Sequence, residues 1–131
     1  MLKFFLFSGS LLCGLGVAAG SFGAHGLKAV LEATGRADNW ETAVRYCLYH
    51  GLAILIIAMA AALPQAAQGR GLLAAAGWCF LVGVLIFSGC LAALALSGVR
   101  ILGAIVPIGG VLFLLGWGLT AAAALKIKPP L

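Results

Sequence analysis

The sequence predicts an all-α membrane protein, a four-transmembrane-helix bundle with a short amphipathic interfacial helix between the first and second spans. Hydrophobic residues make up 64% of the 131-residue chain and charged residues only 8%, whereas a soluble domain carries about 25% charged residues. The mean hydropathy is +1.20, so lipid must cover most of the surface. Four separate stretches also reach the roughly 20 apolar residues that a helix needs to cross a bilayer.

These stretches form a single integral membrane domain, residues 1–131, with expected spans at about 4–22, 43–63, 71–96 and 101–125. The first span has a basic start like a secretory signal, but its apolar stretch is longer than a signal needs, so we expect it to be retained. Pro64 ends the second span. Only SGVR separates the third span from the fourth, and such short connections make neighbouring helices antiparallel.

The connection between the first two spans is the long one, and it predicts an interfacial helix at about 25–35. Its apolar residues recur at helical spacing on one face and its charged residues on another, as in an amphipathic helix. The apolar face holds Leu27, Val30 and Leu31, and the charged face holds Lys28, Glu32 and Arg36.

Two signals mark the passage from this helix into the second span. Gly35 is placed to end the interfacial helix. Asp38 and Glu41 then stand three residues apart in DNWE, the spacing of a capping box. We therefore expect the second helix to begin before the hydrocarbon does.

Small residues in the first span predict close helix packing. Gly16 and Gly20 form a GxxxG pair, and Ser10 and Gly14 form a second small-xxx-small pair. Such pairs let helix backbones approach each other in lipid.

The fourth span contains GAIVPIGG, residues 103–110, with Pro107 and Gly109. Because proline cannot donate to the preceding turn, we expect a helix kink there. The glycines are interpreted as packing positions, and the alternative is that the kink opens a cavity for a ligand.

Polar side chains crowd the start of the second span in ETAVRYCLYHGLAILI, residues 41–56. Arg45 can extend its charged group back to the headgroups, and Tyr46 and Tyr49 suit an aromatic belt. These residues are interpreted as anchors of one end of the span. His50 lies deeper, where ionisable side chains usually face the bundle and find a partner.

The other histidine, His25, lies on the same side of the membrane at the end of the first span. The two histidines could form a structural hydrogen bond between helices, handle a proton or ligand, or ligate a haem. We expect a shallow polar pocket, open to the non-cytoplasmic side, formed by His25, Arg45, Tyr46, Tyr49 and His50.

All side-chain carboxylates of the chain lie in one surface connection, at Glu32, Asp38 and Glu41. Arg100, in the last connection, is expected on the same side of the membrane. We therefore predict that Arg100 or Arg45 pairs with at least one of these acids and ties the surface helix over the bundle mouth. The spacing from Glu41 to Arg45 is the favoured order of an i, i+4 pair.

Charge placement also bears on orientation and excludes nucleic acid as a partner, because single basic residues between spans form no phosphate-binding stripe. The basic residues divide equally between the two sides, so the positive-inside rule alone does not decide. All acids lie on the second side, and we predict cytoplasmic termini in a bacterial inner membrane. The terminal side holds Lys3, Arg70, Lys126 and Lys128, and the other side holds Lys28, Arg36, Arg45 and Arg100.

The residues indicate no enzyme. No pairing of a nucleophile with a base is visible, the cysteines lack metal-binding spacing, and we expect neither a metal nor a cofactor. We expect a non-enzymatic structural or accessory component of a membrane assembly, either a homo-oligomer or a subunit of a larger complex, in contact with membrane lipid. The alternative is a module that binds a small ligand, a quinone or a haem through His25 and His50.

Four motifs, in order, resemble one known family. They are SFGAHGLK (21–28), YCLYHGLA (46–53), FSGCLAAL (87–94) and LGAIVPIGGVLFLLGW (102–117). The chain is similar over nearly its whole length to the small inner-membrane proteins that include bacterial YgdD and animal transmembrane protein 256. The resemblance implies four spans and no known activity. It implies a shared pattern at Gly23, His25, Gly26, His50, Gly51, Pro107 and Gly109.

Overall fold

The computed structural model of the chain describes residues 1–127 and is all-helical over that range. Four of its helices are long and apolar enough to cross a membrane, which confirms the predicted fold class. Lys128, one of the residues used for orientation, lies outside the described residues. In chain order the elements are α1 (Leu2–Ala24), α2 (Lys28–Ala33), α3 (Ala37–Ala62), the 3-10 turn η1 (Pro64–Ala66), α4 (Arg70–Ser97) and α5 (Ile101–Ala124).

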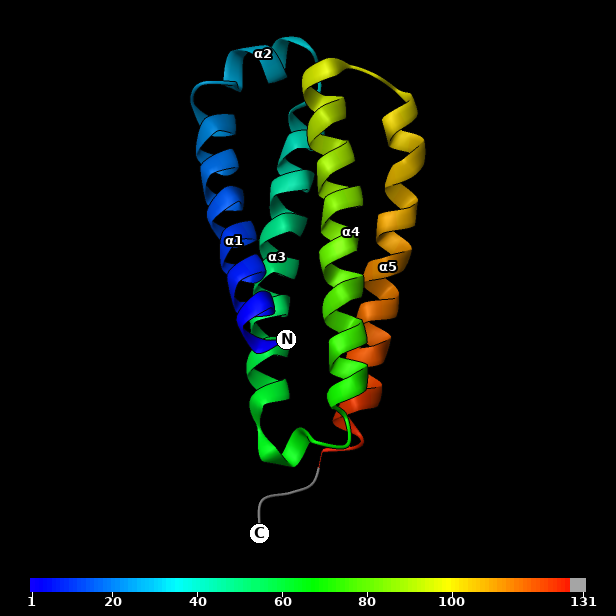
Figure 1. Ribbon diagram of the computed structural model, residues 1–131. Coiled ribbons are helices and arrows are strands. Elements are labelled where there is room, and N and C mark those ends of the chain that lie inside the picture. Colours follow the sequence, from blue (N-terminus) through cyan, green and yellow to red (C-terminus); the bar gives the residue numbers. More distant parts are fainter. Residues whose placement is uncertain (128–131) are drawn as a thin grey trace.

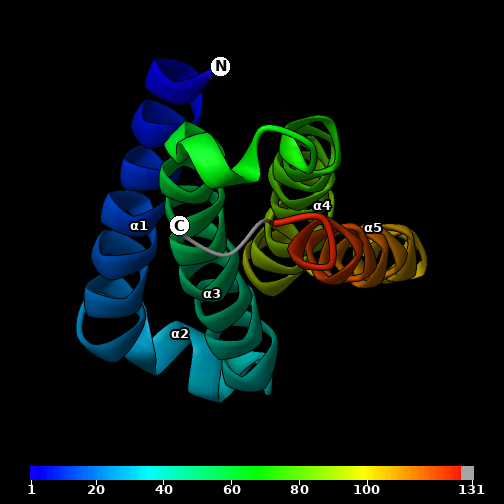
Figure 2. The same ribbon diagram turned by 90° about the horizontal axis from the view of Figure 1, so that it is seen from below.

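The long helices alternate in direction and stand in the order α1, α3, α4, α5 (Figures 1 and 2). Helix α3 packs against both α1 and α4, whereas α5 packs mainly along α4. The short helix α2 lies across one end of the bundle, and the first residues of α1 and the last residues of α5 lie toward the other (Figure 1). The outer helices α1 and α5 therefore each have one main neighbour.

The centre of the bundle is a set of fully buried large side chains, Phe5, Ile54, Ile57 and Phe80. They come from α1, α3 and α4, and α3 lies between the other two helices. A Cβ placed on Gly77 of α4 would lie 2.7 Å from the Phe5 ring. The absence of a side chain at Gly77 thus makes room for the aromatic ring of α1.

Glycines set the distance between α1 and α3, as the GxxxG pair predicts. A Cβ on Gly16 would lie 2.7 Å from a Leu48 methyl group, and one on Gly20 would lie 3.4 Å from Val44. The pair at Ser10 and Gly14 lies elsewhere, since Ser10 is exposed and a Cβ on Gly14 would meet nothing within 4 Å. Helix α1 therefore has one small-residue pair against α3 and a second pair on its outer side.

A second close approach joins α4 to α5. A Cβ on Gly109 would lie 2.6 Å from the backbone nitrogen of Phe87 and 2.9 Å from the carbonyl oxygen of Gly83. Both of these atoms belong to the backbone of α4, so a side chain at Gly109 has no space. Pro107 lies inside α5, which continues through it from Ile101 to Ala124.

The structure corrects the region around α2. The interfacial helix spans Lys28–Ala33 rather than 25–35, and Gly35 follows it with a φ of +66°, the left-handed conformation that glycine favours. The predicted capping box is wrong. Helix α3 begins at Ala37, with Arg36 at its N-cap and no side-chain cap hydrogen bond. Asp38 therefore lies inside the first turn, where its charge suits the helix dipole.

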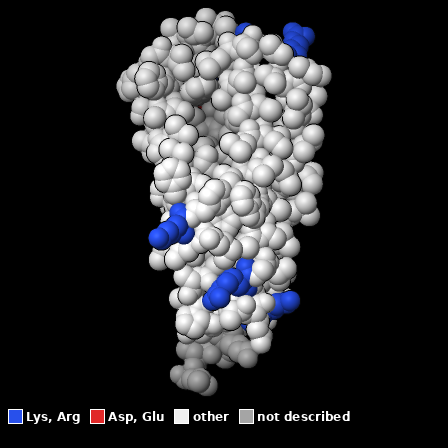
Figure 3. Space-filling view, in the orientation of Figure 1, with Lys and Arg blue, Asp and Glu red and all other residues white. Residues whose placement is uncertain are grey.

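Charged side chains leave a band of uncharged surface on one face of the bundle. On the face seen in Figure 3, Lys and Arg side chains lie near the end that carries α2 and in the opposite half, with uncharged surface between. This distribution is typical of a membrane protein whose charges stay near the headgroups.

Candidate functional site

His50 is a buried polar side chain in the middle of α3, with 4% of its surface exposed. Its Nδ1 atom lies 2.9 Å from the carbonyl oxygen of Tyr46, one turn earlier in the same helix. Its Nε2 atom accepts a hydrogen bond of 3.3 Å from the indole Nε1–H of Trp117 on α5. Both ring nitrogens therefore have a partner.

These two contacts determine the protonation of the His50 ring. An indole N–H can only donate, so Nε2 must carry a lone pair. A carbonyl oxygen can only accept, so Nδ1 must carry the proton. The geometry therefore describes a neutral imidazole that joins α3 to α5. The structural hydrogen bond considered from the sequence involved the two histidines, whereas the partner of His50 in the structure is Trp117. A haem iron could bind Nε2 only after Trp117 had left it.

Aromatic rings surround the imidazole. The ring of Phe113 stacks on it with a centroid distance of 3.5 Å and an interplanar angle of 7°. Phe80 contacts it from α4 at 5.3 Å. Tyr46 stacks on Phe87 at 4.6 Å and extends the cluster toward the end of the bundle that carries α2. The result is one continuous aromatic contact among α3, α4 and α5.

Beside this cluster lies a recess of about 610 Å³ between α3 and α5. It brings together three of the predicted pocket residues, Tyr46, Tyr49 and His50. Pro107 also lines the recess.

The predicted pocket with two histidines is wrong, because the structure does not bring His25 to His50. His25 caps the C-terminal end of α1 and is exposed. His50 points toward α4 and α5, and the next residue, Gly51, packs against Cys13 of α1 on the other side of α3. Arg45 is also absent from the residues that line the His50 recess, and its guanidinium group lies 3.6 Å from Glu41 instead.

The predicted pairing of Arg45 or Arg100 with an acid is confirmed by the Glu41–Arg45 contact. Its predicted consequence is wrong, since both residues belong to α3 and cannot tie α2 to the bundle. Glu32 pairs within α2, with Lys28 at 3.9 Å. Within residues 1–127, Asp38 and Arg100 form no ion pair.

Two other side chains hold the α2 end of the molecule. The Arg36 guanidinium Nη1 donates to the carbonyl oxygen of Ala95 near the end of α4, at 3.1 Å. The Trp40 indole nitrogen donates to the carbonyl oxygen of Ala19 in α1, at 2.9 Å. Neither contact involves an acidic partner, the only kind expected from the sequence. Carbonyl groups in the last turn of a helix also need donors, and a lone arginine near such an end is a signal for this contact.

Comparison with known proteins identifies the family. The model of a family described as "Protein of unknown function (DUF423)" matches residues 19–110. The chain belongs to the DUF423 family. The resemblance to the family of YgdD and transmembrane protein 256 is thereby confirmed.

Relatives of this DUF423 chain match over nearly its whole length. A UPF0382 membrane protein of Staphylococcus epidermidis is 42% identical over 125 residues, which is 95% of this chain and 98% of the relative. The UPF0382 membrane protein YwdK of Bacillus subtilis is 37% identical over the same shares of both chains. One from Staphylococcus haemolyticus is 43% identical over 88% of this chain and 90% of its own. No solved structure matches the chain significantly.

The comparisons establish a membrane protein and assign no activity. The DUF423 match includes His25, His50, Pro107 and Gly109, whereas Trp117 lies beyond residue 110. The function must therefore be argued from the residues of this chain.

Proposed function

We propose that this DUF423 protein is a non-enzymatic component of a membrane assembly, either a homo-oligomer or a subunit of a larger complex. We place it in the bacterial inner membrane with both termini in the cytoplasm. The observation that carries the proposal is the outer face of α1. There Ser10 is exposed, and a Cβ on Gly14 would meet nothing within 4 Å.

Small residues four apart let a second helix approach closely in a membrane. The same helix gives an internal example, because its Gly16 receives the Leu48 side chain of α3. On the outer face, Phe7 and Val17 flank the small pair and are 69% and 61% exposed. Small residues flanked by large apolar side chains suit a partner helix.

The polar groups of the spans support a structural role rather than a catalytic one. His50 uses both ring nitrogens to connect α3 with α5. All three carboxylate residues lie at the α2 end of the protein, in exposed positions. Within residues 1–127, no three His, Cys, Asp or Glu side chains come close enough to hold a metal ion.

The test is the native mass of the protein purified in mild detergent. We expect a mass of two or more copies, or of one copy with a co-purifying protein. Gly14→Leu would place a large side chain between the small residues of the outer face and shift the mass toward one copy. Gly118→Leu is the matched control, since Gly118 also has nothing within 4 Å but lies on α5. A clean monomer of the unaltered protein would contradict the proposal.

A second candidate function is the binding of a flat, quinone-like molecule beside His50. The observation that favours it is the recess of about 610 Å³, whose lining includes Tyr46, Phe113 and Trp117. Aromatic side chains stack well on planar ligands. An absorbance spectrum of the purified protein tests this function. A ligand band that is lost in His50→Ala would support it, and the absence of both a quinone band and a Soret band would remove it.

A further inference from the structure

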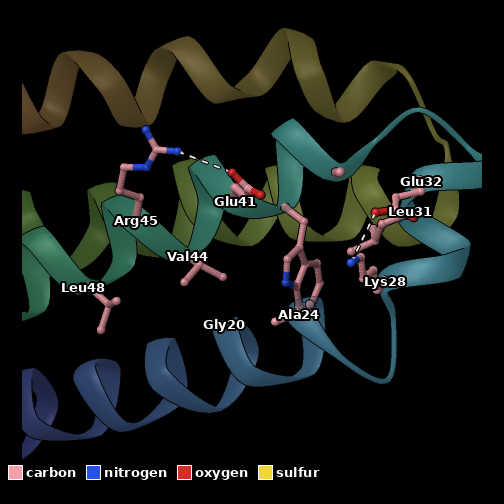
Figure 4. Close-up of a pocket in the computed structure, with 12 residues that line it drawn as sticks. Gly20, Ala24, Lys28, Leu31, Glu32, Glu41, Val44, Arg45 and Leu48 are labelled. Carbon is pink, nitrogen blue, oxygen red and sulfur yellow. Dashed lines mark ion pairs between the residues drawn. The ribbon is translucent and has the colours of Figure 1, made fainter.

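A second recess, of about 510 Å³, opens among α1, α2 and α3 at the end of the bundle that carries α2 (Figure 4). Its lining includes four charged side chains. Lys28 and Glu32 come from α2, and Glu41 and Arg45 come from α3. Neither the aromatic recess nor the outer face of α1 includes them.

The charges of this recess are balanced and loosely paired. Lys28 Nζ lies 3.9 Å from Glu32, and Arg45 lies 3.6 Å from Glu41. These separations exceed the roughly 2.7–2.9 Å of a strong charge-assisted hydrogen bond. All four side chains are more than half exposed. Both cations and both carboxylates therefore keep bonding capacity for a ligand, and together they carry no net charge.

Below the charged rim, the wall of the recess is apolar. Gly20 and Gly23 on α1 contribute no side chains, and Val44 and Leu48 extend from α3 toward α1 (Figure 4). Leu48 lies two helical turns after Glu41, which is about 10 Å deeper along the axis. A ligand of this recess must therefore be charged at the rim and apolar below it, as a membrane lipid is.

We propose that this recess binds a phospholipid with a zwitterionic primary-amine headgroup, namely phosphatidylethanolamine. The phosphate accepts hydrogen bonds from Arg45 and the ammonium group donates to Glu41, which lie next to each other on α3, and an acyl chain follows Val44. Lys28 and Glu32 form the α2 side of the charged rim. This assignment does not depend on the oligomeric state.

The headgroup chemistry distinguishes this lipid from other common ones. Phosphatidylcholine carries a quaternary amine without N–H groups, so it cannot donate to the carboxylates. Phosphatidylglycerol has no cationic group to donate to the carboxylates, and a recess without net charge does not compensate its net negative charge. The order of affinity should therefore be ethanolamine, then choline, then glycerol.

The experiment is a lipid titration of the detergent-purified full chain, followed by native mass spectrometry, with three lipids of identical acyl chains. We expect the ethanolamine lipid to bind about tenfold more tightly than the choline lipid, as the loss of charge-assisted hydrogen bonds predicts. Water-soluble glycerophosphoethanolamine should not displace the lipid at equal concentration, because it lacks acyl chains. Displacement would assign the site to a soluble ligand and overturn the proposal.

The variant that tests the carboxylates is the double substitution Glu32→Gln with Glu41→Gln. It should remove the preference for the amine and strengthen binding of the glycerol lipid. Asp38→Asn is the matched control, because Asp38 belongs to the same connection but does not line the recess. An unchanged thermal midpoint shows that each variant is folded. Equal binding of all three lipids, or a preference that survives in the double variant, would overturn the proposal.

Discussion

Gly109→Ala should weaken the contact between α4 and α5, although it adds only a methyl group. That methyl group would lie 2.6 Å from the Phe87 backbone nitrogen and 2.9 Å from the Gly83 carbonyl oxygen. A flexible side chain could move away, but these atoms belong to the backbone of α4. The two helices would have to separate along the main interface of α5.

Two effects set the magnitude. Overpacking of this kind costs about 1–3 kcal/mol. Replacement of glycine by alanine inside a helix returns about 1 kcal/mol through higher helix propensity. Gly118→Ala gains the same propensity without a clash, since nothing lies within 4 Å of its Cβ position. The two variants should therefore differ by about 1–3 kcal/mol in free energy of unfolding.

The assay is the unfolding of the protein by SDS added to a mild detergent. Far-UV circular dichroism and tryptophan fluorescence monitor the unfolding. Trp117 on α5 donates a hydrogen bond to His50 on α3, so its fluorescence should report separation of α5 from the other helices. Equal stability of Gly109→Ala and Gly118→Ala would refute the close-approach reasoning.

Three further predictions follow from the contacts of single residues or from charge placement. Trp117→Phe leaves Nε2 of buried His50 without a donor and should cost about 1–2 kcal/mol in the same unfolding assay; an unchanged midpoint would contradict the assigned hydrogen bond. Arg36→Met removes the contact to the Ala95 carbonyl and should speed amide hydrogen exchange in α2, measured by mass spectrometry, whereas Arg100→Met should not. A reporter that works only in the cytoplasm should be active when it is fused to the C-terminus. Activity of a reporter that works only on the other side of the membrane would contradict the proposed orientation.

The architecture was predictable because it depends on composition and length. Uninterrupted apolar stretches, Pro64 and the SGVR turn indicate four antiparallel spans without knowledge of any contact. The GxxxG pair likewise indicated a packing surface. Its partner helix was not predictable, since Gly16 packs against α3 and the motif alone does not specify a neighbour.

The site was predictable only in part. Burial and pairing of His50 followed from the cost of an ionisable group in lipid, and the structure shows both. Its partner could not be chosen, because sequence spacing does not show which face of α3 meets α5. His25 was predicted to share a pocket with His50 only because both residues were expected on the same side of the membrane. A shared membrane side fixes neither the depth of a residue in its span nor its direction around the helix, and the structure separates the two residues.

Photo-crosslinking in intact membranes of the host tests the proposed membrane assembly most directly. A photoreactive residue at position 14, on the outer face of α1, should give a protein adduct of one discrete mass. The same residue at position 56 is the control, because Ile56 is 65% exposed on α3 and should contact lipid. An adduct from position 14 alone is the predicted result. No protein adduct at position 14, or identical adducts from both positions, would contradict the account.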